Sequence, residues 1–232
     1  MGWGMFTQMS AFVMLNECRL SLGQTVCAIH ENECKKTKFM FEIFKFGLEQ
    51  KCKSIHFHWG DIQTFKDKLY EYGLDLEKSE IKSKIEIHEA DKYYRMVNMD
   101  FEKMILNLLE SIRSVLKEGY NGCIVCGDIG WPIRTQESIQ KYIDYYLKFK
   151  NTCPNLPILR ITNFEVDKVS TALLIKLLNS HDMVICSDLS LPTQSLGVPE
   201  KDSKTSKQKN IAKAIMKNTK PLSSCYNEMK LK

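Results

Sequence analysis

Side chains that can bind a ligand gather where the expected strands of this chain end. Thiol, imidazole, indole and carboxylate groups all occur there: Cys27, His30, His56, His58, Trp59, Asp128 and Trp131. The carboxyl ends of parallel strands meet at one edge of a sheet, so these residues are expected to lie together. Indole rings offer apolar walls, and imidazoles with one carboxylate offer a few orienting polar groups. The sequence therefore predicts a pocket for a small organic molecule at this edge, although Cys27 alone is better explained by packing in the core.

Three of the histidines are also candidate metal ligands. His56 and His58 are two residues apart on an expected strand, so both rings project from the same face. His88 follows the next strand, and the three would suit a metal-dependent enzyme if they converged on one ion at about 2.1 Å. Strand spacing alone does not establish that convergence, so we expect no resident metal or other cofactor. Cys123 and Cys126 lie three apart on a strand and face opposite sides, which argues against a shared metal ion.

The turn after the first expected strand resembles the end of a phosphate-binding motif. A phosphate loop reads G-x-x-x-x-G-K-[ST], with glycines that let backbone N–H groups wrap the phosphates. Here Lys36 and Thr37 match its end, both glycines are absent, and Glu31 and Glu33 bring carboxylates to the same turn. Carboxylates repel phosphates strongly in a low-dielectric pocket, so binding of intact ATP is not expected. The alternative is a nucleotide-binding ATPase that uses Lys36 and Thr37, with Asp128 placed as a Walker B carboxylate would be.

The elements that must position these residues alternate regularly along the chain. Apolar runs predict strands at 25–29, 53–58, 84–88, 122–126, 158–162 and 183–186. Amphipathic segments predict helices at 35–48, 61–72, 100–117, 135–149 and 166–179, with an irregular stretch around Tyr93 and Tyr94. Strands that alternate with helices form βαβ units. We therefore predict an α/β fold in three αβα layers, with a mainly parallel sheet of six strands.

Charge and residue composition divide the chain into three segments. Residues 1–22 form a lead-in with one expected helix, residues 23–188 the predicted domain, and residues 189–232 a tail. The last 33 residues carry nine lysines against three acids, whereas the whole chain has a net charge of +5. The basic character thus belongs to the tail, which we expect to be flexible and to contact nucleic acid only weakly and without sequence preference.

Composition favours a globular protein of the cytoplasm. The 232 residues are 44% hydrophobic and 26% charged, and the longest apolar stretch near the start, Ala11 to Leu15, is far too short to cross a membrane. Nine cysteines are an odd number and are scattered, as is usual for reduced thiols in a cytosol. We therefore expect no membrane contact.

A series of short motifs, in order and at consistent spacing, covers about residues 20 to 187. They are the stretches 22–30, 46–48 and 51–55, Gly73, Tyr93-Tyr94, Asp100-Phe101, Gly119-Tyr120, 127–131 and Val184-Ile185. This order resembles the MEDS domain, the methanogen and methylotroph sensory domain first recognised in the dichloromethane-responsive repressor. The resemblance implies a RecA/KaiC-like core that has lost its phosphate loop, and a role in sensing small hydrocarbon derivatives.

The resemblance also implies that the domain is non-catalytic and acts in the signal transduction or transcriptional regulation of a prokaryote, namely an archaeon. Where the family's first strand reads G-x-H-x-C-x-x-Y, this chain keeps Gly23 and Cys27 but has Thr25 for the histidine and His30 for the tyrosine. A role of that histidine is therefore not carried over. Output is expected through a protein partner such as a kinase or regulator, through a homo-oligomer, or through the basic tail.

Overall fold

The strands of this protein form two sheets. The computed structural model describes residues 12–15, 18–96, 100–129, 136–152, 156–166 and 171–186. β1 (Phe12–Leu15) and β2 (Cys18–Ser21) pair antiparallel. The second sheet has six strands in the order β5-β4-β6-β7-β3-β8, and every pairing in it is parallel. Its strands are β3 (Thr25–His30), β4 (Cys52–His58), β5 (Ile85–Glu89), β6 (Gly122–Asp128), β7 (Ile158–Glu165) and β8 (Met183–Cys186).

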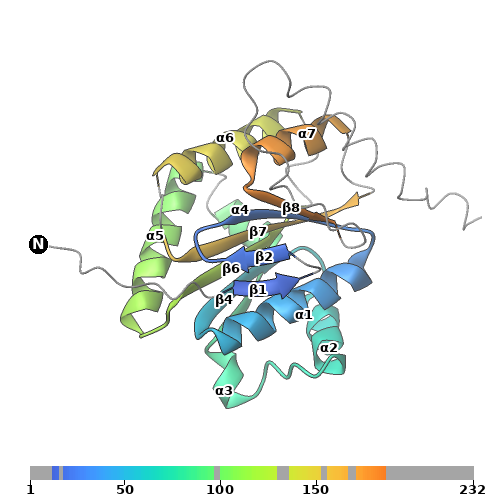
Figure 1. Ribbon diagram of the computed structural model, residues 1–232, viewed down its shortest axis with the longest axis vertical. Coiled ribbons are helices and arrows are strands. Elements are labelled where there is room, and N and C mark those ends of the chain that lie inside the picture. Colours follow the sequence, from blue (N-terminus) through green and yellow to red (C-terminus); the bar gives the residue numbers. More distant parts are fainter. Residues whose placement is uncertain are drawn as a thin grey trace, which may run out of the picture.

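Helices cover both faces of the six-stranded sheet and complete the three layers (Figure 1). α1 (Glu33–Glu49) and α2 (Ile62–Glu71) pack on one face, where Phe44 and Phe65 belong to the same buried cluster. α5 (Phe101–Lys117), α6 (Gln136–Thr152) and α7 (Thr171–Ser180) pack on the other face, with Ile112, Tyr146 and Leu177 buried there. Two short helices, α3 (Ser79–Lys82) and α4 (Ala90–Met96), flank β5. The predicted α/β fold in αβα layers is confirmed.

Strand alternation distributes side chains between the two faces. Cys27 belongs to the cluster under α5–α7, whereas its neighbour Ala28 belongs to the cluster under α1 and α2. Cys123 and Cys126 likewise lie in different clusters, as their spacing predicts. Both faces of these strands are buried, which is why they read as continuous apolar runs rather than as alternating patterns.

Side-chain caps start the helices directly after the strands. The Asn32 side chain accepts a hydrogen bond from the backbone N–H of Lys35 at 3.0 Å and so caps α1, two residues after β3 ends. Asp61 caps α2 in the same way through the N–H of Thr64 at 3.0 Å. The first turns of α1 and α2 therefore lie at the carboxyl edge of the sheet, beside the ends of β3 and β4.

The structure corrects the sequence-based expectations in the lead-in and around β5. In the lead-in we expected a helix, but residues 12–15 and 18–21 form the hairpin of β1 and β2. The stretch around Tyr93, expected to be irregular, contains the helix α4, and α3 was not predicted. The tail 189–232 and Trp131 lie outside the described residues.

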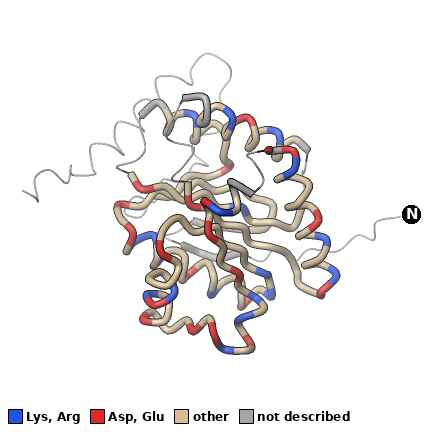
Figure 2. Tube along the Cα trace, turned by 180° about the vertical axis from the view of Figure 1, so that it is seen from behind, with Lys and Arg blue, Asp and Glu red and all other residues tan. Residues whose placement is uncertain are grey.

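Charged residues of both signs are interspersed over the outer helices and loops of the described domain (Figure 2). No single-sign stripe follows the sheet or a helix of the described residues in this view. Among the described residues, no helix has both the length and the apolar character needed to cross a membrane.

Candidate functional site

Asp128, the last residue of β6, lies at the centre of a buried group of polar side chains. Its Oδ2 lies 2.8 Å from Nζ of Lys36 and 3.0 Å from Nδ1 of His58, and accepts a hydrogen bond of 3.2 Å from the backbone N–H of Trp59. Its Oδ1 accepts a hydrogen bond of 3.2 Å from the side-chain amide of Asn163. We call this group the Asp128 cluster; its members are Asp128, Lys36, His30, His56, His58 and Asn163.

Strand register explains why these residues meet. β6 pairs with β7 so that Asp128 lies opposite Asn163, and β4 pairs with β6 so that His56 lies opposite Cys126. Residues opposite each other in a parallel pair share a face. The face that carries Asp128 and His56 is the one covered by α1 and α2. The strand ends therefore converge as the sequence predicts.

The histidines of the cluster are buried, and two of them are neutral at pH 7. Nε2 of His56 lies 3.7 Å from Oδ1 of Asp128, and Nε2 of His30 lies 3.0 Å from Oδ1 of Asn163. Burial lowers the pKa of both His30 and His56 to about 4. The His58 ring stacks on a phenyl ring of α2 with 4.4 Å between ring centres, so that helix closes one side of the cluster.

Lys36 contributes a buried positive charge from the first turn of α1. Its Nζ lies 2.8 Å from a carboxylate oxygen of Glu33 as well as 2.8 Å from Asp128. Burial acts to lower the pKa of Lys36, but the carboxylates of Asp128 and Glu33 outweigh it and raise that pKa above its usual value. Burial acts to raise the pKa of the Asp128 carboxyl, but His56, Lys36 and His58 hold it well below its usual range. Lys36 and Asp128 are therefore a charged pair.

The Asp128 cluster leaves little open space. The hollow beside Asp128, Lys36 and Trp59 measures about 10 Å³, which is room for about one water molecule. His56, His58 and Asp128 offer three ligand atoms within 4.8 Å of one another, a donor set that suits zinc. The Lys36 ammonium group already neutralises the carboxylate, however, so a divalent cation would have to displace it.

The remaining predicted site residues lie elsewhere. Cys27 is buried on the opposite face of the sheet from the Asp128 cluster, and burial raises the pKa of its thiol. His88 also lies on that opposite face, stacked on Phe57 with 5.6 Å between ring centres. Thr37 is buried and its hydroxyl donates to the backbone carbonyl of Glu33 at 2.9 Å. The ligand-binding role of the predicted set stays a prediction, since Trp131 lies outside the described residues.

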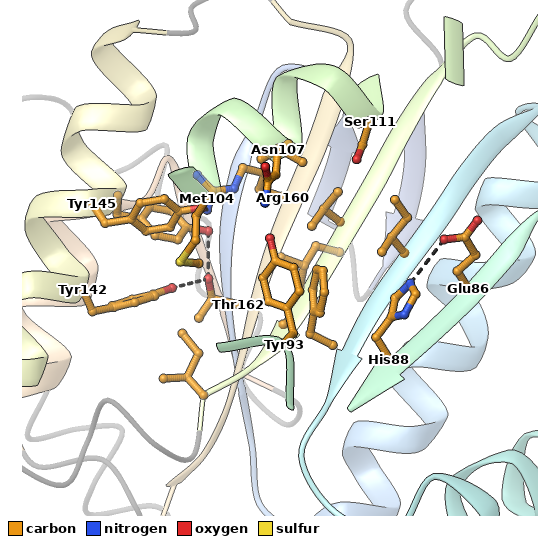
Figure 3. A pocket seen from close by; sticks show the side chains of 18 residues that line it. Glu86, His88, Tyr93, Met104, Asn107, Ser111, Tyr142, Tyr145, Arg160 and Thr162 are labelled. Carbon is orange, nitrogen blue, oxygen red and sulfur yellow. Dashed lines mark hydrogen bonds and ion pairs between the residues drawn. The ribbon is translucent and has the colours of Figure 1, made fainter. Parts of the chain in front are cut away.

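A larger hollow of about 420 Å³ lies on the other face of the sheet, between the strands and helices α4, α5 and α6 (Figure 3). Its floor includes the apolar side chains of Ile55 and Phe57 on β4 and of Val125 on β6. Helices contribute Tyr93, Met104, Leu108, Tyr142, Tyr145 and Tyr146. We call this hollow, with these lining residues and the polar ones described next, the tyrosine pocket.

One end of the tyrosine pocket is built around Arg160 and Thr162 of β7. The Arg160 guanidinium group donates to the Tyr145 hydroxyl at 3.2 Å, and its central carbon lies 4.3 Å from the ring centre of Tyr146 and 4.0 Å from that of Phe149. The Thr162 hydroxyl donates to Tyr146 at 2.8 Å. These contacts fix the guanidinium group against aromatic rings at the pocket wall.

Different polar groups lie at the other end, on β5. Nε2 of His88 lies 3.2 Å from Glu86, and Glu86 also forms an ion pair of 2.7 Å with Lys53. Figure 3 shows this pair and Arg160 at opposite ends of the row of lining side chains. Burial raises the pKa of Tyr93, between the two ends, to about 12. Its phenol therefore stays protonated at physiological pH.

Sequence reasoning missed the tyrosine pocket, although a signal for it exists. Tyr142, Tyr145 and Tyr146 recur at intervals of three and four residues, so they share one face of the helix. That pattern predicts only a packed helix face. The pocket needs in addition the small Gly127 on β6, whose neighbour Asp128 faces the opposite side of the sheet. Which residues oppose that helix depends on the strand order, which the local pattern does not contain.

The comparisons with known proteins assign the chain to a family. A sequence model of the MEDS family, described as methanogen/methylotroph, DcmR sensory domain, matches residues 26–182, so the chain belongs to this family of sensory domains. No curated protein sequence matches it.

Among solved structures, the chain is similar to a KaiC-like protein from the hyperthermophilic archaeon Pyrococcus horikoshii OT3. The two share 16% sequence identity at a TM-score of 0.46, over 63% of this chain. The matched region spans 62% of the length of that structure.

Proposed function

We propose that this domain is a non-catalytic sensor that binds a small organic molecule in the tyrosine pocket. The observation that carries the proposal is the hollow of about 420 Å³ in a domain of a sensory family. Ligand sites of about 300–1,000 Å³ typically combine apolar walls with a few fixed polar groups. The tyrosine pocket has that make-up, with Phe57 and Val125 on its floor and Arg160, Tyr93 and Asn107 among its polar groups.

Volume favours this pocket over the predicted edge at Asp128. A hollow of about 10 Å³ beside Asp128 leaves no room for an organic molecule unless Lys36 or Trp59 moves. The charges of the Asp128 cluster are also already matched to one another. We therefore assign ligand binding to the tyrosine pocket and a structural role to the Asp128 cluster.

The signal would leave the domain through a partner. The proposed receiver is a kinase, a regulator or a second copy of this chain. The proposed setting is the cytoplasm of a prokaryote, which the family implies to be an archaeon. A ligand that contacts α4, α5 and α6 as well as the sheet would change how firmly these helices are held. Their outer faces are the surfaces on which a receiver would detect that change.

Native mass spectrometry of the full chain tests the proposal, because a retained molecule appears as an added mass. The decisive comparison is between two variants of α5. Ser111→Trp places an indole in the tyrosine pocket, whereas Ser114→Trp places one on the exposed side of the same helix. We expect the wild type and Ser114→Trp to retain or rebind a small organic molecule and Ser111→Trp to lose it.

A thermal-shift screen of organic molecules with the same three proteins provides an independent measurement. A ligand that binds the folded state and not the unfolded chain raises the melting temperature, and the stabilisation grows with the ratio of ligand concentration to Kd. If no molecule is retained, and if no compound stabilises the wild type more than Ser111→Trp, the tyrosine pocket is not a ligand site and the proposal is wrong.

A further inference from the structure

Three side chains of the Asp128 cluster place metal-binding atoms around one point. His56 and His58 project from the same face of β4, and Asp128 ends the neighbouring strand β6. Nδ1 of His58 lies 3.0 Å from Oδ2 of Asp128, and Nε2 of His56 lies 3.7 Å from Oδ1. The ligands of a tetrahedral zinc ion are about 3.4 Å apart when each lies about 2.1 Å from the metal. Small movements of these side chains would therefore bring all three to one ion.

The His56 ring supplies a second, independent reason to expect a ligand. It is 0% exposed, and its Nε2 makes no hydrogen bond to any described residue. The separation of 3.7 Å from Asp128 is too long for one. A buried nitrogen without a hydrogen bond destabilises the folded state. A metal ion bound through Nε2 would remove that penalty.

Neighbouring groups hold the Asp128 carboxylate in place. The Asn163 side-chain amide donates to its Oδ1 at 3.2 Å, and Oδ1 of Asn163 lies 3.0 Å from Nε2 of His30. The backbone N–H of Trp59 donates to Oδ2 at 3.2 Å. Metal-binding carboxylates are oriented by outer hydrogen bonds of this kind.

Lys36 is the cation that neutralises Asp128, and it has a second partner. Its Nζ lies 2.8 Å from Asp128 and 2.8 Å from a carboxylate oxygen of Glu33. The Glu33 side chain is 39% exposed, whereas that of Asp128 is 5% exposed. An ammonium group that released Asp128 would keep Glu33 as its counter-charge and lie closer to solvent. Asp128 would then bind another cation.

The donor set and the available space favour zinc among the divalent cations. Mg²⁺ and Ca²⁺ take oxygen ligands, and two of the three donors here are imidazole nitrogens. Two histidines and one carboxylate also bind non-haem Fe²⁺, but that centre keeps several positions open for other ligands. The hollow beside Asp128 measures about 10 Å³, which is room for about one water molecule. Zinc with three protein ligands needs only one water to complete its coordination.

We propose that His56, His58 and Asp128 form a zinc site, which the ion enters in exchange for the Lys36 ammonium group. The ion would tie the end of β4 to the end of β6, in line with the structural role assigned to this cluster. The proposal is independent of the tyrosine pocket, which lies on the opposite face of the sheet.

Zinc titration of the full chain against a chromophoric chelator, after EDTA treatment and removal of the EDTA, tests the site. The wild type is compared with His56→Gln, His58→Gln and His88→Gln. His88 is half-exposed on the opposite face and is the matched control. We expect the wild type and His88→Gln to bind a zinc ion that the other two variants lose or bind at least about tenfold more weakly.

Cobalt in place of zinc reports the ligands directly. Four-coordinate Co²⁺ absorbs visible light far more strongly than six-coordinate Co²⁺, and thiolate ligands add a band in the near ultraviolet. We expect strong visible absorption without the thiolate band in the wild type, and its loss in His56→Gln. A thiolate band would place the ion at cysteines and overturn the proposed ligand set.

Two variants of residues that are not ligands test the exchange with the ammonium group. Lys36→Met removes the competing cation and should bind zinc at least about tenfold more tightly. Glu33→Gln removes the alternative partner of Lys36 and should weaken zinc binding by about threefold or more. Far-UV circular dichroism and the melting temperature establish that each variant is folded. Glu33→Gln keeps the test valid if Lys36→Met does not fold.

The proposal is wrong if the wild type binds no zinc with a Kd below roughly 10 μM, or if His56→Gln and His58→Gln bind it as tightly as the wild type. The exchange is wrong if folded Lys36→Met binds zinc no more tightly than the wild type. The proposed function is tested separately, by Ser111→Trp in the tyrosine pocket.

Discussion

Nζ of Lys36 lies 2.8 Å from Oδ2 of Asp128, and the two side chains are 3% and 5% exposed. This pair joins the first turn of α1 to the last residue of β6, across 92 positions of sequence. A buried pair of this kind is a poor source of net stability, because desolvation of both ions offsets their attraction. Its loss is nevertheless costly, since the remaining partner becomes an uncompensated buried charge.

Removal of Lys36 should therefore destabilise the domain strongly. For Lys36→Met we expect the free energy of unfolding to fall by about 3 kcal/mol or more, as for other broken buried pairs. Glu33→Gln, which removes the half-exposed partner of the same ammonium group, should cost about 1 kcal/mol or less. Urea denaturation measures both. A loss below about 1 kcal/mol for Lys36→Met would show that the pair does not hold the α1 turn against β6.

The same pair leads to a prediction about nucleotides. Lys36 is committed to Asp128 and Glu33, and the Thr37 hydroxyl donates to a backbone carbonyl of its own helix, so neither group is oriented toward a phosphate. We expect no measurable binding of Mg-ATP by isothermal titration. A dissociation constant below roughly 10 μM, about −7 kcal/mol, would instead favour the alternative of a nucleotide-binding ATPase. A phosphate-loop ATPase titrated in the same buffer is the positive control.

Stability should fall as the pH is lowered from 7 to 5. Burial lowers the pKa of His30 and His56 to about 4 and that of His181 to about 3, whereas an unfolded histidine titrates near 6.5. Between these values the unfolded chain binds protons that the folded chain does not, so the folded state loses stability as the pH falls. Asp128 does not oppose this trend, because the pKa of its carboxyl stays well below the window.

Each of these histidines should lower the free energy of unfolding by on the order of 2 kcal/mol at pH 5 relative to pH 7. Urea denaturation at pH 7 and pH 5 measures the total decrease in the free energy of unfolding. For the variant His56→Gln this decrease should be smaller by about the contribution of one histidine. His88→Gln changes a half-exposed histidine and serves as the control. Equal stability of the wild type at the two pH values would mean that the buried histidines are not held neutral.

The fold was largely predictable because its signals are local. The six strands of the parallel sheet and the five long helices each follow from an apolar run or a helical period within one segment of sequence. The hairpin of β1 and β2 was not predictable in that way, because strands of four residues carry little periodic signal. α4 was missed for a similar reason, since seven residues span only about two helical turns and show little periodicity.

The site was predictable only in part. Convergence of His56, His58 and Asp128 follows from their positions at the ends of parallel strands, and the structure places them together. The sequence does not reveal that Lys36 pairs with Asp128, because that depends on how closely α1 approaches the sheet. Arg160 lies in the middle of a strand and reads as an outlier in an apolar run, so its place in the tyrosine pocket emerges only from the packing of α6 on β7.

Gly122, the first residue of β6, should tolerate no larger side chain. A Cβ atom there would lie 2.5 Å from the backbone carbonyl oxygen of Pro157 and 2.6 Å from a methyl group of Leu22. The backbone oxygen cannot rotate away, so Gly122→Ala should shift the start of β6 and cost about 1–3 kcal/mol. Gly47→Ala is the matched comparison, because the nearest atom to its Cβ is the Ser54 hydroxyl oxygen, also at 2.5 Å, which can rotate. Alanine also favours the helix there by about 1 kcal/mol, so Gly47→Ala should be the milder change. Urea denaturation of the two variants decides the order, and a Gly122→Ala protein as stable as the wild type would contradict the close approach of β6 to the Pro157 backbone.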